Sequence, residues 1–423
     1  MAGKYKSIRG TRDILPGQSE RWQYVERVAL ESAATFGMRE IRIPTIEKTE
    51  LFTRSVGQAT DVVQKEMYTF DKGRESITLR PEGTAGTLRA VLENSMLADT
   101  LPLKLCYTVS CFRHDNPQAG RYREFVQFGV ECLGNPSPTA DAEVIGVAYD
   151  ILTRLGVEEG LSLQLNSIGC PDCRPGYNAA LTAYYQGHRE SLCKTCLERL
   201  ERNPLRLLDC KEDSCKALAG DAPQTTDHLC GGCAEHFDGL KKRLDAIGLG
   251  YAVNPFIVRG LDYYTKTVFE FVSPLLGAQS TVCGGGRYDG LIEELGGPPT
   301  PALGFGLGLD RLILVMEAAG SRFPDPARCD LYIGSMGEEE NIKALELATA
   351  LRRQGFYILC DTVGRSVKAQ MRYADKVGAA YSCILGSQEI QEGTARIKRM
   401  ADGEAVEVAL TAQAFAAALS IDN

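Results

Sequence analysis

One stretch, Cys111 to Glu131, constrains the fold of this chain more than any other. Its sequence is CFRHDNPQAGRYREFVQFGVE, in which turn residues at Asn116-Pro117 and Ala119-Gly120 precede a segment that alternates as strand residues do. The pattern predicts two strands joined by a loop. Its loop region contains three arginines, Arg113, Arg121 and Arg123, against only Asp115 and Glu124. Guanidinium groups suit capture of phosphate oxygens, so the hairpin either holds a polyphosphate or carries solvated arginines.

Three further motifs favour the first of these interpretations. They are LRPEGT at Leu79–Thr84, VRGLDYY at Val258–Tyr264 and GFGLGLDRL at Gly304–Leu312. Together with the hairpin they resemble the class II aminoacyl-tRNA synthetases, and within that class the histidyl-tRNA synthetase family. The resemblance extends from about Ile8 into the C-terminal part of the chain and so covers nearly all of it.

The resemblance implies an α+β protein with three parts. We expect a class II catalytic domain, with an antiparallel sheet and flanking helices, at residues 1–165 and 251–325. Cysteine pairs and charged helical stretches between them indicate an inserted, mainly helical domain at 166–250. The resemblance implies that residues 330–423 form an α/β domain that binds the anticodon. A length of 423 residues fits two or three domains.

Residue patterns predict several elements independently of the resemblance. Apolar spacing indicates helices at 20–36 and 141–155, and alternation indicates a strand at 39–46. Because Pro44 removes a ladder donor, that strand is expected at an edge or an interface; in the family this segment builds the dimer interface. In the C-terminal part the pattern predicts strands at 330–335, 356–360 and 380–385 and helices at 338–353 and 366–377.

Composition limits the protein's class and partners. Hydrophobic residues make up 44% and charged residues 24% of the chain, as in ordinary globular proteins. No apolar run reaches membrane-spanning length and the N-terminus lacks a signal-peptide core, so we expect no membrane partner and a cytoplasmic location. A formal charge of −8 argues against non-specific coating of nucleic acid, although local basic patches could still hold a tRNA.

Fifteen cysteines are present, and eight of them fall between Cys170 and Cys233. They include pairs with CxxC spacing at Cys170-Cys173, Cys193-Cys196 and Cys230-Cys233, together with Cys210 and Cys215. Each such pair can supply two of the four ligands of a structural zinc ion, and eight ligands are enough for two sites. The alternative is that these cysteines are core residues, because cysteine is commonly buried. The sequence leaves both open.

The C-terminal end of the catalytic pattern combines glycines with an arginine. Gly304, Gly306 and Gly308 alternate, which would allow a flat ligand to approach the strand, and the spacing does not fit a dinucleotide-binding fingerprint. A helix beginning near Leu309 carries Arg311 in its first turn. A helix N-terminus with an arginine is either an anion site or an ordinary charged surface.

The resemblance implies that ATP, with Mg²⁺, activates L-histidine as an adenylate, which then acylates the tRNA. The ATP-binding residues would be Arg113 at the α-phosphate, Arg121 and Arg311 at the outer phosphates, Phe125 against the adenine and Asp115 at its exocyclic amine. The family often has glutamate at the position of Asp115. Arg259, with Arg113, would be catalytic and stabilise charge on the carboxylate and α-phosphate.

The resemblance also implies the histidine-binding residues. Glu131 and Tyr264 would hold the imidazole, and Tyr263 and Tyr288 would complete the wall. The α-amino group would bind Glu82, Gly83, Thr84 and Gln127, although a carboxylate and hydroxyl before the helix at 85–93 are also typical of a helix cap. Arg113 and Arg259 would contact the histidine carboxylate.

The resemblance further implies contacts with histidine tRNA and a homodimer. Gln118 would meet the acceptor end of the tRNA. Arg365, Lys368, Gln370 and Arg372 either contact the anticodon arm or form a solvated helix face. The rival hypothesis is a catalytically inactive, histidine-binding regulatory paralogue of ATP phosphoribosyltransferase. Such regulators generally lack the C-terminal domain and parts of the ATP machinery, whereas this chain retains both.

Overall fold

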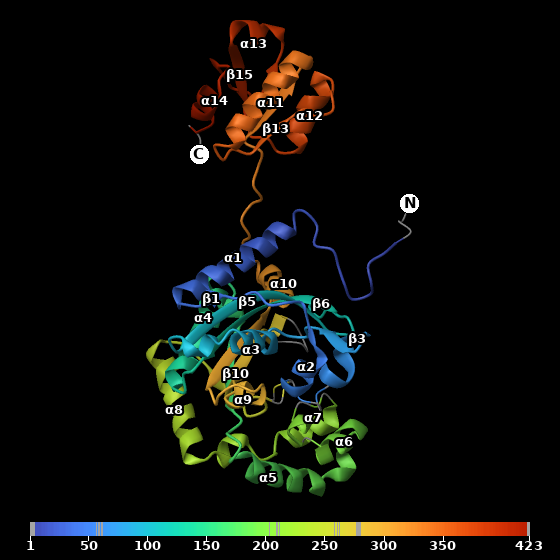
Figure 1. The fold of residues 1–423 in the computed structure, drawn as a ribbon, viewed down its shortest axis with the longest axis vertical. Coiled ribbons are helices and arrows are strands. Elements are labelled where there is room, and N and C mark those ends of the chain that lie inside the picture. The colour runs from blue at the N-terminus through green and yellow to red at the C-terminus, as the bar shows by residue number, and fades with distance from the viewer. Residues whose placement is uncertain are drawn as a thin grey trace. The chain divides into compact units, whose positions relative to one another are not determined.

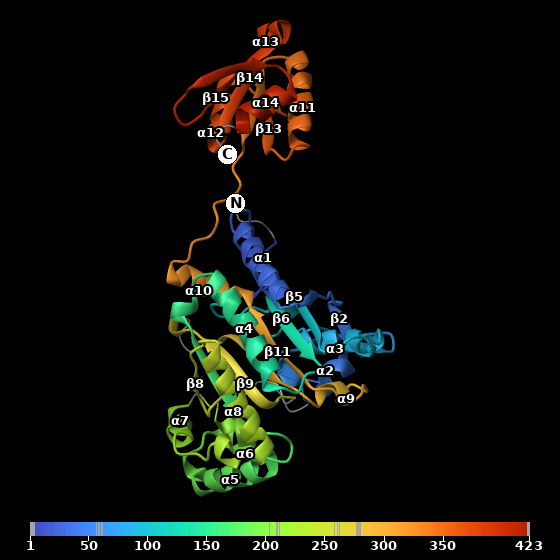
Figure 2. The same ribbon diagram turned by 90° about the vertical axis from the view of Figure 1, so that its left-hand side faces the viewer.

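The structure of the chain is a computed structural model. It describes residues 5–420, apart from residues 56, 58, 59, 61, 203, 209, 211, 258, 260, 262 and 276–280 and the side chain of Arg202. The chain forms two compact units, Met1–Pro324 and Asp325–Asn423 (Figure 1, Figure 2).

The first unit is built on an eight-stranded sheet of order β1-β5-β6-β11-β10-β9-β7-β8. Its strands are β1 (Arg39–Glu40), β5 (Leu103–Phe112), β6 (Glu124–Leu133), β7 (Ser162–Ser167), β8 (Ala252–Val253), β9 (Thr265–Val272), β10 (Thr281–Arg287) and β11 (Ala302–Gly308). Antiparallel pairing joins the six inner strands β5, β6, β11, β10, β9 and β7, whereas the edge strands β1 and β8 pair in parallel with β5 and β7. The hairpin predicted at 111–131 is the pair β5 and β6, with Phe112 opposite Glu124.

The single strand predicted at residues 39–46 is wrong in extent. Only Arg39–Glu40 joins the large sheet, at its edge, and the chain pairs again as β2 (Ile46–Lys48) in a separate three-stranded sheet with β4 (Glu75–Leu79) and β3 (Tyr68–Lys72). Pro44 lies between the two pieces and cannot donate a ladder hydrogen bond. The segment therefore leaves one sheet and enters another.

Alternation along the strands gives the large sheet two different faces. On β6, Phe128, Val130 and Cys132 join the main hydrophobic core with α1 (Ser19–Thr35), α4 (Pro138–Arg154) and α10 (Leu309–Ala319). Gln127 and Glu131 alternate with them and therefore lie on the opposite face. Helices α2 (Thr49–Ser55), α3 (Thr84–Glu93) and α9 (Leu291–Glu294) lie on that second side (Figure 2). Helix α4 begins three residues earlier than predicted because Ser137 caps it and Pro138 occupies its first turn.

Helices fill the segment between β7 and β8. They are α5 (Arg174–Gly187), α6 (Lys194–Arg202), α7 (Asp213–Ala219) and α8 (Gly231–Ala246). Tyr177, Leu181, Tyr185 and Leu200 are part of a hydrophobic cluster formed within this segment. Phe237, Leu240 and Leu244 of α8 instead join the main core, so α8 attaches the helical segment to the body of the unit.

The second unit contains a five-stranded sheet of order β13-β12-β14-β15-β16. Its strands are β12 (Leu331–Ser335), β13 (Ile358–Cys360), β14 (Tyr381–Leu385), β15 (Thr394–Arg399) and β16 (Ala405–Ala409). Its helices are α11 (Glu338–Arg352), α12 (Val367–Lys376), α13 (Ser387–Glu392) and α14 (Ala412–Leu419). The first three strands are parallel, as expected for the alternating pattern, and their bounds differ from the predicted ones by no more than two residues. Among the described residues, no helix is both long and apolar enough to cross a membrane.

Candidate active site

A cavity in the first unit lies over strands β6, β11 and β10. The hairpin loop, the start of α3 and the start of α10 border it, together with Arg259, Leu261, Tyr263 and Tyr264. Most of the site residues predicted from sequence line this cavity: Glu82, Thr84, Arg113, Asp115, Arg121, Phe125, Gln127, Arg259, Tyr263, Tyr264 and Arg311. Gly83 contacts one of them, Gln127. Gln118 is exposed on the hairpin loop and is not among the lining residues.

At one end of the cavity the hairpin loop supplies charged side chains. Arg113 donates from Nε to the carbonyl oxygen of Pro81 at 2.9 Å, and its guanidinium lies 5.4 Å from the centre of the Phe125 ring. Arg121 is paired with Asp115, and Glu66 lies 3.8 Å from it. In this structure Asp115 therefore neutralises part of the charge of Arg121.

Arg311 reaches the same end of the cavity from the first turn of α10. It donates to the carbonyl oxygen of Gly120 at 3.1 Å and to that of Thr281 at 2.7 Å. Burial and the positive charges of Arg121 and Arg113 lower the pKa of Arg311. The three positively charged guanidinium groups therefore repel one another here, and a bound polyanion would relieve this repulsion.

Arg259 lines the cavity, and its guanidinium lies over Gly284 of β10. It pairs with Glu270 of β9, which also accepts a hydrogen bond from Thr281 at 2.8 Å. Burial opposes the charge of Arg259, but Tyr264 and Glu270 together raise its pKa above the ordinary value. Arg259 is thus a fixed cation in an almost buried position, as stabilisation of a developing negative charge requires.

Glu131 is fully buried between two tyrosines. Tyr107 donates to its Oε1 at 3.0 Å, and Tyr288 donates to its Oε2. Burial raises the pKa of Glu131 to about 8, against the hydrogen bonds, which act to lower it. The carboxyl group is therefore mostly protonated at pH 7, and it can exchange a proton with a ligand that titrates near neutrality.

Glu82 lies two residues before α3 and is also buried. Its carboxylate accepts hydrogen bonds from the backbone N–H groups of Thr84 at 2.6 Å and Ala85 at 2.9 Å, so the helix-cap interpretation of this residue is correct. Burial raises the pKa of Glu82 despite these bonds. Gln127 on β6 accepts from the N–H of Gly83 at 3.1 Å, which places an amide beside the carboxylate.

Tyr263 and Tyr264 line one side of the cavity, and Tyr288, which is buried and does not line it, packs against Tyr263. We call these three residues the tyrosine wall. The ring centres of Tyr263 and Tyr264 are 4.6 Å apart, and those of Tyr263 and Tyr288 are 5.5 Å apart. The Arg259 guanidinium lies 5.4 Å from the centre of the Tyr264 ring. Of the VRGLDYY motif, Val258, Gly260 and Asp262 lie outside the described residues.

The glycines of β10 and β11 make room for side chains of the protein itself. A Cβ on Gly304 would lie 2.0 Å from Glu131 Oε2, one on Gly306 would lie 2.1 Å from Gln127 Nε2, and one on Gly284 would lie 2.4 Å from Arg259 Nη1. The prediction that Gly304 and Gly306 expose bare backbone to a flat ligand is therefore incomplete. Their main effect is to let polar side chains lie flat on the sheet.

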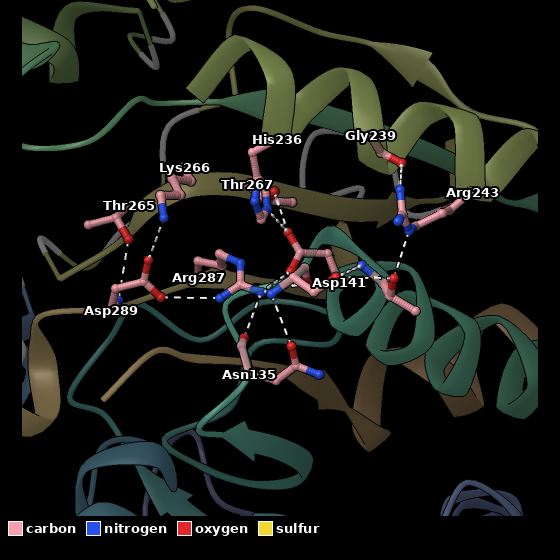
Figure 3. Close-up of polar contacts among 12 residues, drawn as sticks. Asn135, Asp141, His236, Gly239, Arg243, Thr265, Lys266, Thr267, Arg287 and Asp289 are labelled. Carbon is pink, nitrogen blue, oxygen red and sulfur yellow. Dashed lines mark hydrogen bonds and ion pairs between the residues drawn. The ribbon is translucent and has the colours of Figure 1, made fainter. Parts of the chain in front are cut away.

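A buried polar network holds the end of β10 (Figure 3). Arg287 is fully buried; it pairs with Asp141 of α4 at 2.6 Å and with Asp289 at 3.2 Å. Asp141 also accepts from Thr267 and contacts His236 of α8, both at 2.6 Å. Burial opposes ionisation of Asp141, but the contact with His236 and the charge of Arg287 lower its pKa. Because Arg287 immediately precedes Tyr288, the network fixes the direction of that tyrosine.

The residues of the site that were not predicted from sequence include Tyr107, which holds Glu131, and Glu270, which pairs with Arg259. Tyr107 lies opposite Gly129, where a Cβ would come within 2.2 Å of its ring, so the glycine inside an otherwise regular strand was the available signal. Glu270 stands between Phe269 and Phe271, and a carboxylate within an apolar strand indicates a charged partner.

The eight cysteines of the helical segment lie in two groups of four. Within each group the sulfur atoms are all within 4.8 Å of one another. The groups are Cys170, Cys173, Cys230 and Cys233, and Cys193, Cys196, Cys210 and Cys215. All eight are free thiols, so the structure contains two sets of ligands suited to a soft metal ion.

Comparison with known proteins assigns both parts of the chain. The family model described as histidyl-tRNA synthetase matches residues 10–172 and 190–312, and the model described as an anticodon binding domain matches residues 330–415. Histidine–tRNA ligases of Acetivibrio thermocellus and Clostridium perfringens are 52% and 50% identical to the chain over 403 residues. Each alignment covers 95% of this chain and 96% of the relative.

Solved structures agree with these assignments. The crystal structure of apo S. aureus histidyl-tRNA synthetase matches with a TM-score of 0.82 and 36% identity, over 98% of this chain and 99% of that one. A structure described as an ATP phosphoribosyltransferase regulatory subunit/histidyl-tRNA synthetase from Bacillus halodurans matches with a TM-score of 0.66 and 24% identity, over 92% of this chain and all of that one. At that identity the second match concerns the fold alone.

Proposed function

The chain belongs to the histidyl-tRNA synthetase family and is an ATP-dependent histidine–tRNA ligase. From this premise we propose which substrate group each residue of the site binds and which residues stabilise the transition state. The rival hypothesis of an inactive regulator is not supported, because relatives about 50% identical over 95% of the chain are ligases. The observation that carries the proposal is the fixed arginine Arg259, which lines the same cavity as Arg113, Arg121 and Arg311 and lies against the ring of Tyr264.

In the first step the carboxylate oxygen of histidine attacks the α-phosphorus of ATP. A new oxygen–phosphorus bond forms, the bond from the α-phosphorus to the bridging oxygen breaks, and pyrophosphate leaves. In the second step a terminal ribose hydroxyl of the tRNA attacks the acyl carbon, and AMP leaves. The first nucleophile is already an anion, so catalysis rests on positioning and charge stabilisation rather than on a protein base.

At the cationic end we assign phosphate binding to the three arginines. Arg113 holds the α-phosphate, and Arg121 and Arg311 hold the outer phosphates. Phe125 stacks on the adenine. Asp115 would face the exocyclic amine only after releasing Arg121, with which it is paired here. Asp115 and Glu270 already pair with Arg121 and Arg259, so we assign Mg²⁺ to phosphate oxygens and water, its usual partners in such sites.

At the other end we assign recognition of histidine. Glu131, between Tyr107 and Tyr288, shares one proton with the imidazole, and Tyr264 supplies a second polar contact. Tyr263 closes the wall. Glu82, Thr84 and Gln127, with the backbone of Gly83, receive the α-amino group. A site that pairs both ring nitrogens discriminates strongly against side chains that lack them, because its own buried polar groups would then be left unpaired.

The remaining assignments concern the parts of the chain and its partners. We propose that residues 1–165 and 251–325 catalyse the reaction, that 166–250 is an insertion, and that 330–423 binds the anticodon of histidine tRNA. Gln118 would contact the acceptor end of the tRNA, which suits its exposure. We further propose a cytoplasmic homodimer with structural Zn²⁺ in the insertion.

The experiment is histidine-dependent exchange of pyrophosphate into ATP by Arg259→Ala. We expect the turnover rate to fall by about 10²–10³-fold, the usual effect of removing one transition-state donor, with unchanged far-ultraviolet circular dichroism. The matched control is Arg243→Ala on α8, whose guanidinium binds Thr139 at 2.7 Å and does not line the cavity. Full exchange activity in Arg259→Ala would refute the role of Arg259.

A further inference from the structure

The two groups of cysteines occupy different places in the helical insertion. The first group joins the start of the insertion to the start of its last helix. Cys170 and Cys173 follow β7, and Cys230 and Cys233 lie at the start of α8, some sixty residues later in the chain. We call this group the neck site. The second group, Cys193, Cys196, Cys210 and Cys215, lies wholly within the insertion around α6 and α7, and we call it the distal site.

The sulfur–sulfur distances fit a tetrahedral metal centre. Cys170 lies 3.6 Å from Cys173 and 3.9 Å from Cys230, and Cys193 lies 3.8 Å from Cys210. Four thiolates at the zinc–sulfur distance of about 2.3 Å form a tetrahedron with edges of about 3.8 Å. A disulfide would require about 2.05 Å, and all of these cysteines are free.

Backbone N–H groups point at the sulfur atoms in both groups. The N–H of Cys230 donates to Cys173 Sγ at 3.1 Å, that of Cys193 to Cys215 Sγ at 3.3 Å and that of Cys196 to Cys193 Sγ at 3.4 Å. Such bonds stabilise thiolates, as expected of groups that orient metal ligands.

The alternative of ordinary core cysteines does not account for the neck site. Buried thiols pack among apolar side chains, whereas Cys230 is exposed and Cys170 is only half-buried. We therefore propose that the chain binds two structural Zn²⁺ ions, one in each group of four thiolates. Neither site offers an open position for substrate, so neither ion is catalytic.

The neck site is connected to the tyrosine wall of the cavity through the backbone. Just before the first cysteine, the N–H of Ile168 donates to Lys266 and the N–H of Lys266 donates to Gly169, both at 2.8 Å. Just after Cys173, the guanidinium of Arg174 donates to the carbonyl oxygen of Tyr264. The loop that carries the first two ligands therefore holds the strand end that presents Tyr264.

A second connection runs through α8, as Figure 3 shows. His236 lies one helical turn after Cys233 and contacts Asp141, which pairs with Arg287 beside Tyr288. The neck ion would thus fix the first turn of α8 and, through it, the polar network that holds the end of β10. We infer that the neck ion positions the histidine pocket, an inference that rests on the proposed role of Tyr264 and Tyr288, whereas the distal ion stabilises only the insertion.

The test begins with metal analysis of the purified full-length chain and of two double variants. We expect two zinc ions per chain in the wild type and one in each variant, Cys170→Ser with Cys230→Ser and Cys193→Ser with Cys210→Ser. Cobalt-substituted wild-type protein should show the visible absorption of tetrahedral thiolate-bound cobalt. A wild type without zinc, or a variant that loses both ions or neither, would overturn the two-site assignment.

The positioning role is tested by exchange kinetics without tRNA. We expect the neck variant to raise the KM for histidine by about tenfold or more with little change in the KM for ATP, and the distal variant to change neither. A third variant, Arg174→Met, retains every cysteine ligand, so it should keep both ions and still raise the KM for histidine. It tests the positioning role even if the neck variant fails to fold. An unchanged histidine KM in both would overturn this role. Two zinc ions in a wild type without exchange activity would instead support the sites and refute the proposed function.

Discussion

Glu131 gives a quantitative test, because its carboxyl group is buried and forms no ion pair with any cation among the described residues. Burial raises its pKa from 4.5 to about 8. A raised pKa means that the folded chain holds the proton more tightly than the unfolded chain. The stability that depends on Glu131 is therefore complete below pH 4.5 and is lost as the pH rises toward 8, at about 1.4 kcal/mol per pH unit.

The perturbation is Glu131→Gln, which keeps the shape of the side chain and removes its titration. We expect the unfolding free energy of the variant, minus that of the wild type, to rise by about 2–3 kcal/mol between pH 5 and pH 7. Trp22 is the only tryptophan of the chain and is buried in α1, so its fluorescence during urea denaturation reports on the first unit. A difference that stays constant over this range would refute the argument from burial.

The same variant tests the assignment of Glu131 to the imidazole. We expect titration calorimetry at pH 7 to show weaker histidine binding by at least about tenfold, or ~1.4 kcal/mol, and unchanged ATP binding. The free histidine has the same protonation state in both experiments at pH 7, so the wild type is the control for the variant. Equal weakening of histidine and ATP would count against the assignment.

Three other substitutions probe separate parts of the site. Gly304→Ala would bring a Cβ within 2.0 Å of the Glu131 carboxyl group; we expect calorimetric histidine affinity to fall at least about tenfold, and unchanged affinity would show that the glycine is not needed. Arg311→Ala removes one of the guanidinium groups at the phosphate end, so steady-state exchange should show a higher KM for ATP with the KM for histidine within about twofold; a shift in the histidine KM alone would contradict the division of the cavity. Arg287→Met leaves the fully buried Asp141 without its cation, and we expect urea denaturation to show a loss of about 3–5 kcal/mol, whereas a loss below 1 kcal/mol would mean that the network is not required.

The parts of the fold that follow from local chemistry were predictable from sequence. The hairpin of β5 and β6 follows from alternation and turn residues, and the alternating strands and helices of the second unit follow from their period. The strand at 39–46 was wrong because a proline marks a break in pairing but does not say that the chain then enters another sheet.

Site residues could be predicted from sequence only where they belong to a recognisable motif. Arg113, Arg259 and Arg311 lie in recognisable motifs and come together at the cavity. Tyr107 and Glu270 act through neighbours on other strands, and strand order is a property of the folded chain that local sequence does not encode. The same reason explains the cysteines: their spacing indicates ligands, but only the fold pairs the first two with the last two.

The most direct test of the central claim is exchange of pyrophosphate into ATP, measured with each of the twenty amino acids in the absence of tRNA. A cavity lined by fixed arginines for the phosphates, with a buried glutamate between tyrosines beside it for the imidazole, should support exchange with histidine alone. Exchange with another amino acid, or none with histidine in folded protein, would contradict the account.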